Sequence, residues 1–364
     1  MILTKDIAYK EIRKFFTSNP TPLVVFGSGL SCSIDNDFGM GKLKEELCSK
    51  IPSIIKGRVE IESQWQQVVE SLNKDMDLES SMNHITIDEL IRIVADVTGN
   101  LISKIDEKYS HEILTGKTNW NAIEFFKRLV DGLPESDPTL NVVTPNYDML
   151  AEYSFEKVGI KYINGFIGSL YRKIDWAQSR RSICYSEKNI QRNKVKFISK
   201  KYKHIELHKV HGSLNTFIHN DQVIEANSWI YEPPADVERV IITPGISKYE
   251  KISQFRQELI AKYDEIVENK DAFIFIGYGF NDAHIEQYLR PKLKNMKCHG
   301  IIITRDNNKR IEDLLDLSDN LWLICKQDLD NNTRIKNKNY EDWLYLKDCY
   351  IWNIQEFTKE ILGD

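Results

Sequence analysis

No stretch of the 364 residues stays apolar over the roughly 18 positions that a membrane-spanning helix needs. The first residues also lack the apolar core of a signal peptide, because Lys5, Asp6, Lys10 and Glu11 interrupt them. These two absences predict a cytoplasmic protein that makes no contact with a membrane.

Cysteine is scarce, and its spacing follows no metal-binding or redox pattern. The six cysteines form no C-x-x-C pair and are scattered at Cys32, Cys48, Cys184, Cys298, Cys325 and Cys349. This spacing is not that of a disulfide framework or a zinc ribbon. We therefore expect reduced thiols, no zinc module and no metal site.

Charge of one sign is not in large excess, since the formal net charge is −5 at pH 7. That balance argues against a surface that coats nucleic acid in general, but it allows a local basic patch. Within residues 172–203 only Asp175 and Glu187 oppose a group of bases: Arg172, Lys173, Arg180, Arg181, Lys188, Arg192, Lys194, Lys196, Lys200, Lys201 and Lys203. Two interpretations stay open, a solvated excursion or a docking surface for nucleic acid or an acidic partner.

The most informative stretch begins with the four apolar residues 23–26, which predict a short buried strand. Gly27, Ser28 and Gly29 follow directly, and glycines let the backbone turn sharply and bring its N–H groups close to a ligand. A helical pattern over residues 42–50 completes a strand, glycine turn and helix. The turn alone fits a phosphate cradle and an ordinary tight connection equally well.

Further short apolar runs alternate with helical patterns along the chain. Runs near residues 141–144, 205–210, 240–244, 271–276, 301–304 and 321–324 predict buried strands. Strands of this kind belong to a parallel sheet covered on both faces. The fold class is therefore α/β, with a Rossmann-like parallel sheet covered by helices.

We expect the whole chain, residues 1–364, to form a single domain with three additions. Residues 54–131 read as a helical insertion, with Thr86 and Glu89 as a capping box, and residues 160–204 as a basic insertion. Residues 330–364 form an aromatic tail that serves either core packing or a subunit interface.

Polar residues of unusual kinds follow four of the expected strands. The four motifs are Gly27-Ser28-Gly29-Leu30-Ser31, Thr144-Pro145-Asn146-Tyr147-Asp148, His211-Gly212-Ser213 and Gly277-Tyr278-Gly279-Phe280-Asn281-Asp282. Ligands of parallel sheets bind at the carboxyl ends of the strands. Taken alone, Asn146 fits a turn residue and His211 a structural histidine; taken with the other motifs, they predict a site.

In order and character, these four motifs resemble the sirtuin-like fold that consumes NAD. They are most similar to the bacterial sirtuin-like NAD hydrolases of anti-phage defence, and the resemblance extends over most of residues 20–305. It implies that Asn146 positions the nicotinamide ribose and the attacking water, and that His211 is the general base. It implies cofactor-binding roles for the remaining motif positions: Gly27, Ser28, Gly29, Ser31, Asp148, Gly277, Tyr278 and Asp282.

The chemistry of such a site is consistent with these residue types. Cleavage of the nicotinamide–ribose bond expels a neutral leaving group through an oxocarbenium-like transition state, so the leaving group needs no acid. A base is needed for the ribose hydroxyl or for water, and histidine has a suitable pKa. An amide can position the ribose because it donates and accepts hydrogen bonds without carrying charge.

Departures from the deacylase pattern favour plain NAD hydrolysis. No cysteine spacing could build the four-cysteine zinc module of sirtuin deacylases, and Pro145 stands where those enzymes usually have Gln. An acyl-lysine substrate is therefore disfavoured, and ADP-ribosyl transfer is a lesser alternative. An NAD or ADP-ribose sensor without catalysis is the main competing hypothesis. A nuclease is a weaker one, because no metal-carboxylate motif accompanies the basic stretch.

The resemblance also implies how such an enzyme would be controlled. Because unrestrained loss of NAD would kill the host cell, we expect activation by assembly or by a partner. The family analogy points to a homo-oligomer and to a HerA-type ATPase as partner. Contact with nucleic acid stays an open alternative.

Overall fold

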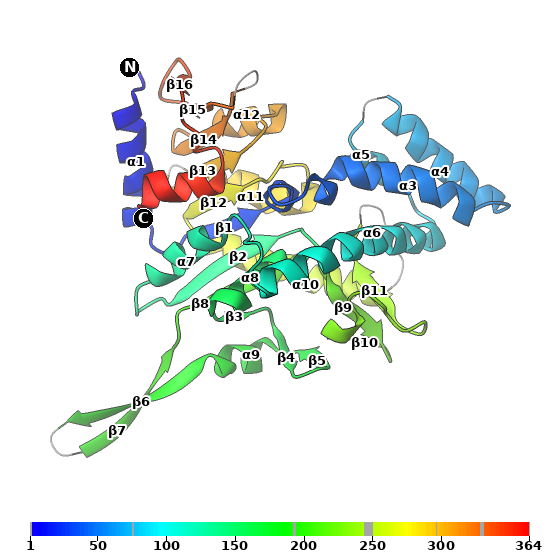
Figure 1. The fold of residues 1–364 in the computed structure, drawn as a ribbon, viewed down its shortest axis with the longest axis horizontal. Coiled ribbons are helices and arrows are strands. Elements are labelled where there is room, and N and C mark those ends of the chain that lie inside the picture. Colours follow the sequence, from blue (N-terminus) through cyan, green and yellow to red (C-terminus); the bar gives the residue numbers. More distant parts are fainter. Residues whose placement is uncertain are drawn as a thin grey trace.

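A nine-stranded sheet runs through the centre of the structure, a computed structural model that describes residues 2–74, 76–191, 194–243, 250–295, 297–327 and 331–363. The strand order is β16-β15-β14-β13-β12-β1-β2-β8-β3 (Figure 1). In chain order the strands are β1 (Leu23–Phe26), β2 (Thr139–Thr144), β3 (Tyr162–Ile163), β8 (His204–Lys209), β12 (Ala272–Ile276), β13 (His299–Thr304), β14 (Leu321–Lys326), β15 (Thr333–Asn337) and β16 (Leu344–Leu346).

All neighbours from β14 to β3 pair in parallel, and only β15 and β16 add antiparallel strands at one edge. The central strands are buried on both faces, since Leu23 and Val25 pack into one core while Val24 and Phe26 pack into the other. The predicted α/β class, with a parallel sheet between helices, is confirmed.

Two groups of helices cover the two faces of the sheet. On the face of Val24 lie α1 (Lys5–Ser18), α7 (Ile123–Asp131), α8 (Leu150–Val158) and α13 (Ile354–Phe357), which ends in the π-helix η3 (Thr358–Leu362). On the face of Val25 lie α10 (Glu250–Glu268), α11 (Ala283–Leu293) and α12 (Lys309–Leu315).

Four further helices form a unit with its own apolar core, which we call the helical cap. They are α3 (Met40–Ile54), α4 (Val59–Leu72), α5 (Leu78–Met82) and α6 (Asp88–Leu114). The helix α7, which lies within the segment predicted as an insertion, instead packs on the sheet.

The predicted capping box at the start of α6 is wrong, because Ile87 occupies the cap position. The side-chain amide of Gln64 on α4 takes over this role: its oxygen accepts hydrogen bonds from the backbone N–H groups of Thr86 and Ile87, each at 3.0 Å. A contact between two helices of the cap therefore replaces the local motif.

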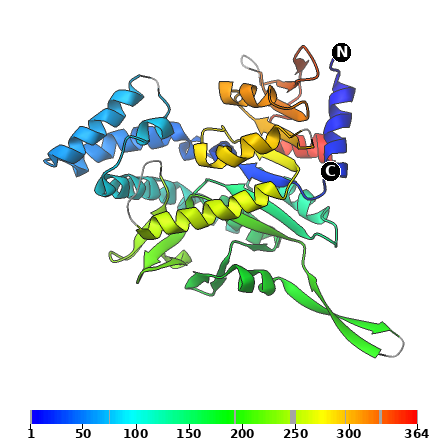
Figure 2. The same cartoon turned by 180° about the vertical axis from the view of Figure 1, so that it is seen from behind.

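The segment predicted as a basic insertion folds into several elements. It contains β4 (Phe166–Gly168), β5 (Arg172–Ile174), α9 (Trp176–Ser182) and a hairpin of β6 (Cys184–Gln191) and β7 (Lys194–Lys201) that projects from the body in both views (Figures 1 and 2). Strands β4 and β5 join β9 (Gly212–His219), β10 (Gln222–Glu225) and β11 (Glu238–Ile241) in a five-stranded sheet, with the 3-10 helix η2 (Asn227–Trp229) between β10 and β11.

The bases of this segment have different surroundings. Arg172 and Arg180 form ion pairs with the buried carboxylates of Glu225 and Glu206, at 2.7 and 2.8 Å. Most of the lysines of the hairpin are exposed, and Arg192 lies outside the described residues. Both interpretations of the basic stretch remain predictions.

The aromatic residues of the C-terminal segment do not share one role. Phe357 is fully buried and packs against Phe16 and Phe125 in the core beneath α1. Tyr345 and Tyr350 are exposed. Core packing therefore accounts for part of this segment.

We expect Gly277→Ala to lower the free energy of unfolding by about 2 kcal/mol or more. Gly277 has φ +54°, and a Cβ there would lie 2.5 Å from the backbone nitrogen of Leu30. Gly41→Ala is the matched control, since a Cβ at that helical position meets nothing within 4 Å. Urea unfolding of both variants measures the difference, and equal stability of the two would contradict this packing.

Candidate active site

The four motifs follow four strands that are neighbours in the sheet. Strands β12, β1, β2 and β8 lie side by side and run in the same direction, so their carboxyl ends meet at one edge. The motifs begin at Gly277, Gly27, Pro145 and His211, each within two residues of its strand. The sequence places these motifs up to 250 residues apart, and the sheet brings them together.

Two glycine turns cross beneath the site. The backbone N–H of Gly29 donates to the carbonyl of Gly277 at 3.0 Å, and a Cβ on either residue would meet backbone atoms of the other turn at under 3 Å. The glycine turn after β1 opens only the single-turn helix α2 (Ser28–Ser31). The 3-10 helix η1 (Asn36–Phe38) then separates α2 from α3, which begins at Met40 and contains the helix predicted over residues 42–50.

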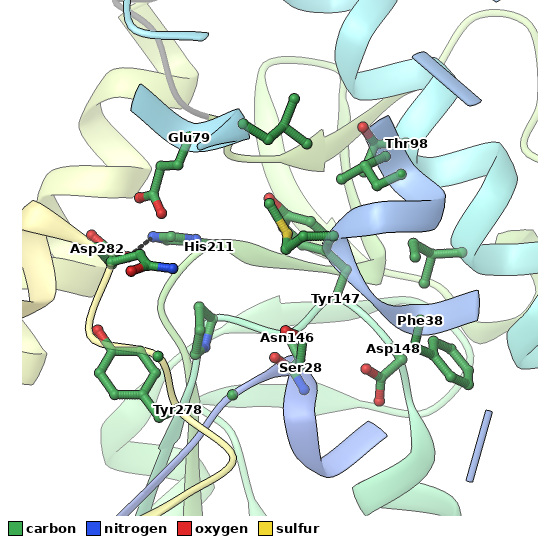
Figure 3. A pocket seen from close by; sticks show the side chains of 18 of the residues that line it. Ser28, Phe38, Glu79, Thr98, Asn146, Tyr147, Asp148, His211, Tyr278 and Asp282 are labelled. Carbon is green, nitrogen blue, oxygen red and sulfur yellow. Dashed lines mark ion pairs between the residues drawn. The ribbon is translucent and has the colours of Figure 1, made fainter. Parts of the chain in front are cut away.

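Above these turns lies a cavity of about 220 Å³ between the sheet edge and the helical cap (Figure 3). Seven of the ten site residues predicted from the sequence line it, namely Gly27, Ser28, Asn146, Asp148, His211, Tyr278 and Asp282. Apolar side chains of the cap and of η1 also line it: Phe38, Met40, Leu43, Leu78 and Ile102.

Ser31 links two residues of the motif after β2. Its hydroxyl accepts a hydrogen bond from the Asn146 side-chain amide at 3.0 Å and donates one to the Asp148 carboxylate at 2.8 Å. All three side chains are buried. Ser31 does not line the cavity, and its position is that of a bridge that fixes the orientation of Asn146.

A buried lysine holds the same loop from below. Lys209, at the end of β8, donates to the carbonyl of Asp148 and to the hydroxyl of Ser213 and forms a 2.7 Å ion pair with Glu152. Burial raises the pKa of the Asp148 carboxyl, while Lys209 and the hydrogen bond from Ser31 act in the opposite direction.

The cap is also tied to this loop through a buried carboxyl group. Asp106 on α6 accepts a hydrogen bond from the backbone N–H of Met149 and one from the hydroxyl of Tyr153, each at 2.7 Å. Burial raises the pKa of Asp106 to about 7, although these hydrogen bonds oppose the shift. The backbone after β2 is thus positioned from the sheet side and from the cap side.

His211 lies against Asp282 across the site, and 2.7 Å separates Nε2 of the histidine from Oδ2 of the carboxylate (Figure 3). The other oxygen of Asp282 accepts from the backbone N–H groups of His284 and Ile285 and so caps α11. Burial alone would raise the pKa of Asp282, but His211 and these two N–H groups lower it to about 2. The carboxylate therefore holds the imidazole in a fixed orientation.

The charged side chains that line the cavity are almost all acidic. Asp77, Glu79, Asp148 and Asp282 contribute carboxyl groups, and His211 is the sole basic group among the described lining residues. Such a wall favours a cation over an anion.

A second cavity, of about 470 Å³, adjoins the first and is lined mainly by polar groups. The two cavities share Glu79, His211, Asn281 and Asp282. Arg256, Arg290 and Arg310 are found only in the wall of the second cavity. The His211–Asp282 pair therefore separates an acidic, otherwise apolar space from a polar one.

Sequence reasoning missed the residues that the helical cap contributes to the site. Glu79 on α5 and Thr98 on α6 line the first cavity, and neither stands in a local motif that marks it. Sequence reasoning did not predict the pairing of Asp282 with His211, and the cofactor-binding role predicted for Asp282 stays a prediction. His208 lies apart from the site, stacked on Trp176 with 4.9 Å between the ring centres.

Comparison with known families gives a match that spans three of the four motifs. The sequence profile of the family described as "SIR2-like domain" matches residues 140–323, just over half of the chain, and this span contains Asn146, His211 and Asp282. The chain therefore belongs to the SIR2-like domain family.

A search of solved structures finds a distant similarity. One structure, titled "Structural Basis for the Mechanism and Regulation of Sir2 Enzymes", aligns with a TM-score of 0.41 and 12% sequence identity, over 85% of this chain and 90% of that chain. No curated protein matches the sequence. Among the described residues, no helix has both the length and the apolar character needed to cross a membrane, and no cluster of metal-ligating side chains occurs.

Ser31→Ala is expected to lower the free energy of unfolding by about 1–3 kcal/mol, because it leaves the buried groups of Asn146 and Asp148 without their shared partner. Ser53→Ala is the control, since the Ser53 hydroxyl is exposed and bonds only within its own helix. Thermal unfolding compares the two variants. A loss no larger for Ser31→Ala than for the control would exclude the bridging role.

The His211–Asp282 pair gives a pH-dependent contribution to stability. The pKa of Asp282 lies near 2 in the fold and near 3.9 in an unfolded chain, so the contacts of its carboxylate with His211 and with the two N–H groups together stabilise the fold by about 2 kcal/mol above pH 4 or so, and this is lost as the pH falls toward 2. We expect the stability difference between wild type and Asp282→Asn to shrink over that window. Urea unfolding at several pH values measures it, and a constant difference would refute the pairing.

Proposed function

We propose that this protein is an NAD⁺ hydrolase that releases nicotinamide and ADP-ribose. The observation that carries the proposal is the convergence of Asn146 and the His211–Asp282 pair on one acidic cavity at the carboxyl ends of four parallel strands. Membership of the SIR2-like family agrees with NAD as the substrate.

The cavity suits the nicotinamide half of NAD⁺. The nicotinamide ring carries a positive charge, and the walls combine apolar side chains with carboxyl groups and contain no described lysine or arginine. Charge builds up on the ribose as the glycosidic bond breaks, so the same carboxylates would stabilise an oxocarbenium-like transition state.

The protein groups have separate roles in this reaction. Asn146, fixed by Ser31, would hold the ribose and orient water through its amide. His211, oriented by Asp282, would take a proton from the ribose hydroxyl or from water. Ser28 and the backbone N–H groups of the glycine turn would face the phosphates, and Tyr278 would lie beneath the adenosine half.

A sensor that binds NAD without chemistry is the alternative. A binding module needs a complementary cavity but has no need for an imidazole oriented by a buried carboxylate. The pairing of His211 with Asp282 therefore favours the enzyme. Deacylation is disfavoured, because the six cysteines are scattered along the sequence and no spacing among them offers a four-cysteine zinc module.

We also propose a role in anti-phage defence through NAD depletion, with no zinc and with activity controlled by assembly. The family analogy supports a cytoplasmic homo-oligomer that works with a HerA-type ATPase or another partner. Size-exclusion chromatography with light scattering tests the oligomer directly.

Nicotinamide release from NAD⁺ by the purified chain tests the enzyme. We expect Asn146→Ala and His211→Ala each to lower kcat by at least about 100-fold, since each removes a group that acts in the transition state. His299→Ala is the matched control, because His299 is exposed at the amino end of β13, far from the site along that strand.

Binding measurements separate the two functions. We expect His211→Ala to bind NAD⁺ within a few-fold of wild type while its turnover is lost. Tight NAD⁺ binding by wild type without nicotinamide release, also in a lysate of phage-infected cells, would instead favour the sensor.

A further inference from the structure

We propose that Glu79, carried into the site by the helical cap, is a catalytic residue that accepts the proton of the attacking water. This inference rests on the proposed NAD⁺ hydrolysis and names a third protein group for it. In this assignment Glu79 accepts the proton of the attacking water, and the His211–Asp282 pair contacts the ribose hydroxyl.

The position of Glu79 is the first basis for this assignment. It lies at the junction of the two cavities and lines both, as do His211, Asn281 and Asp282. Figure 3 shows its side chain reaching from α5 toward the His211–Asp282 pair. The polar cavity is the natural source of water, and the acidic cavity is the one that suits the nicotinamide ribose. A base at their junction meets the water as it reaches the reacting carbon.

The contact of His211 with Asp282 is the second observation that supports the assignment of Glu79. Its Nε2 already lies 2.7 Å from the Asp282 carboxylate, so one ring nitrogen serves orientation. A reaction that must both hold the ribose hydroxyl and deprotonate water gains from a second group. Glu79 is the one carboxyl group in the shared wall that forms no ion pair with a described residue, and it is half-buried.

A clamp through Arg310 on α12 holds the helix that carries Glu79. The guanidinium of Arg310 donates to the Asn281 side-chain oxygen at 3.0 Å and lies 3.4 Å from the Asp77 carboxylate. Asp77 in turn caps α5 by accepting hydrogen bonds from the backbone N–H and the hydroxyl of Ser80. The arginine thereby joins the cap to the loop after β12, and Glu79 is positioned relative to His211.

The proton affinity of Glu79 suits a base near neutral pH. Burial, with the nearby carboxylates of Asp282 and Asp77, raises the pKa of Glu79 to about 8, while Arg310 acts to lower it. The charged and titratable groups around it come from the N-cap of α5, from the loops after β2, β8 and β12, and from α10, α11 and α12: Asp77, Tyr147, His211, Arg256, Tyr278, Asp282, Glu286 and Arg310. Binding of the cationic nicotinamide ring would favour the ionised form of Glu79, which is the form that accepts a proton.

The step balances as follows. The water oxygen forms a bond to C1′ of the ribose while the bond from C1′ to the nicotinamide nitrogen breaks. The electron pair of that bond stays on nicotinamide, which leaves as a neutral molecule. The water proton passes to the Glu79 carboxylate and then to solvent, so the products are ADP-ribose, nicotinamide and one proton.

The first test measures turnover. We expect Glu79→Gln to lower kcat/KM for NAD⁺ by about 100-fold or more and to remove the rise of kcat/KM with pH that wild type shows up to about pH 8. Glu70→Gln makes the same change at an exposed position of the same cap and is expected to match wild type. An unchanged rate and pH profile in Glu79→Gln would overturn the proposal.

The second test needs no turnover. It uses an NAD⁺ analogue in which a methylene group replaces the ribose ring oxygen, which keeps the cationic ring but resists hydrolysis. Calorimetry near pH 7 in two buffers of different ionisation enthalpy gives the number of protons released on binding. We expect release by wild type and Glu70→Gln and none by Glu79→Gln. Binding with equal proton release in all three would overturn the role of Glu79.

The two tests separate this inference from the proposed function. If wild type binds the analogue with Glu79-dependent proton release but shows no turnover, the proposed hydrolase activity is rejected. The position of Glu79 beside the cationic ring is then retained. If wild type shows full turnover that does not depend on Glu79, the catalytic role of Glu79 is rejected and the hydrolase activity is retained. If wild type does not bind the analogue, both the proposed hydrolase activity and the role of Glu79 are rejected.

Discussion

Burial of the central strands on both faces is the constraint from which the rest of the structure follows. Leu23 and Val25 must face one core and Val24 the other, and burial of each such side chain stabilises the fold by roughly 1.5–3 kcal/mol. Strands of this kind pair in parallel beneath helices, so their carboxyl ends all open at the same edge. The residues after β12, β1, β2 and β8 meet there as a consequence of packing, and backbone contact between Gly29 and Gly277 brings two of these turns together.

The site depends equally on the helical cap, which closes over this edge with a core of its own. Hydrogen bonds from the backbone and side chains after β2 to Asp106, and the Arg310 contact with Asp77, fix the cap at two separate points. The apolar wall, the hydroxyl of Thr98 and the carboxyl of Glu79 all come from this unit. Any movement of the cap would therefore open the cavity and withdraw Glu79 at the same time.

Local patterns were sufficient to predict six of the nine strands of the central sheet, whereas the apolar run predicted near residues 240–244 forms β11 of the five-stranded sheet instead. Continuous apolar runs marked the central strands, and unusual polar residues directly after them marked Asn146, Asp148 and His211. The remaining features depend on tertiary contacts that no local pattern encodes. Glu79 sits in a five-residue helix without a motif, Asp282 meets His211 only through the sheet order, and Gln64 replaces the predicted cap at Thr86. The hydrogen bonds of Ser31 with Asn146 and Asp148 were not predicted either, because they join residues more than 100 positions apart in the sequence.

The most direct test of the central claim is a crystal structure of the full chain with a hydrolysis-resistant NAD⁺ analogue. This account predicts the cationic ring in the acidic cavity beside Asn146 and Asp148, with the ribose facing His211 and Glu79. A ring bound in the arginine-lined cavity near Arg256, or outside both cavities, would contradict it.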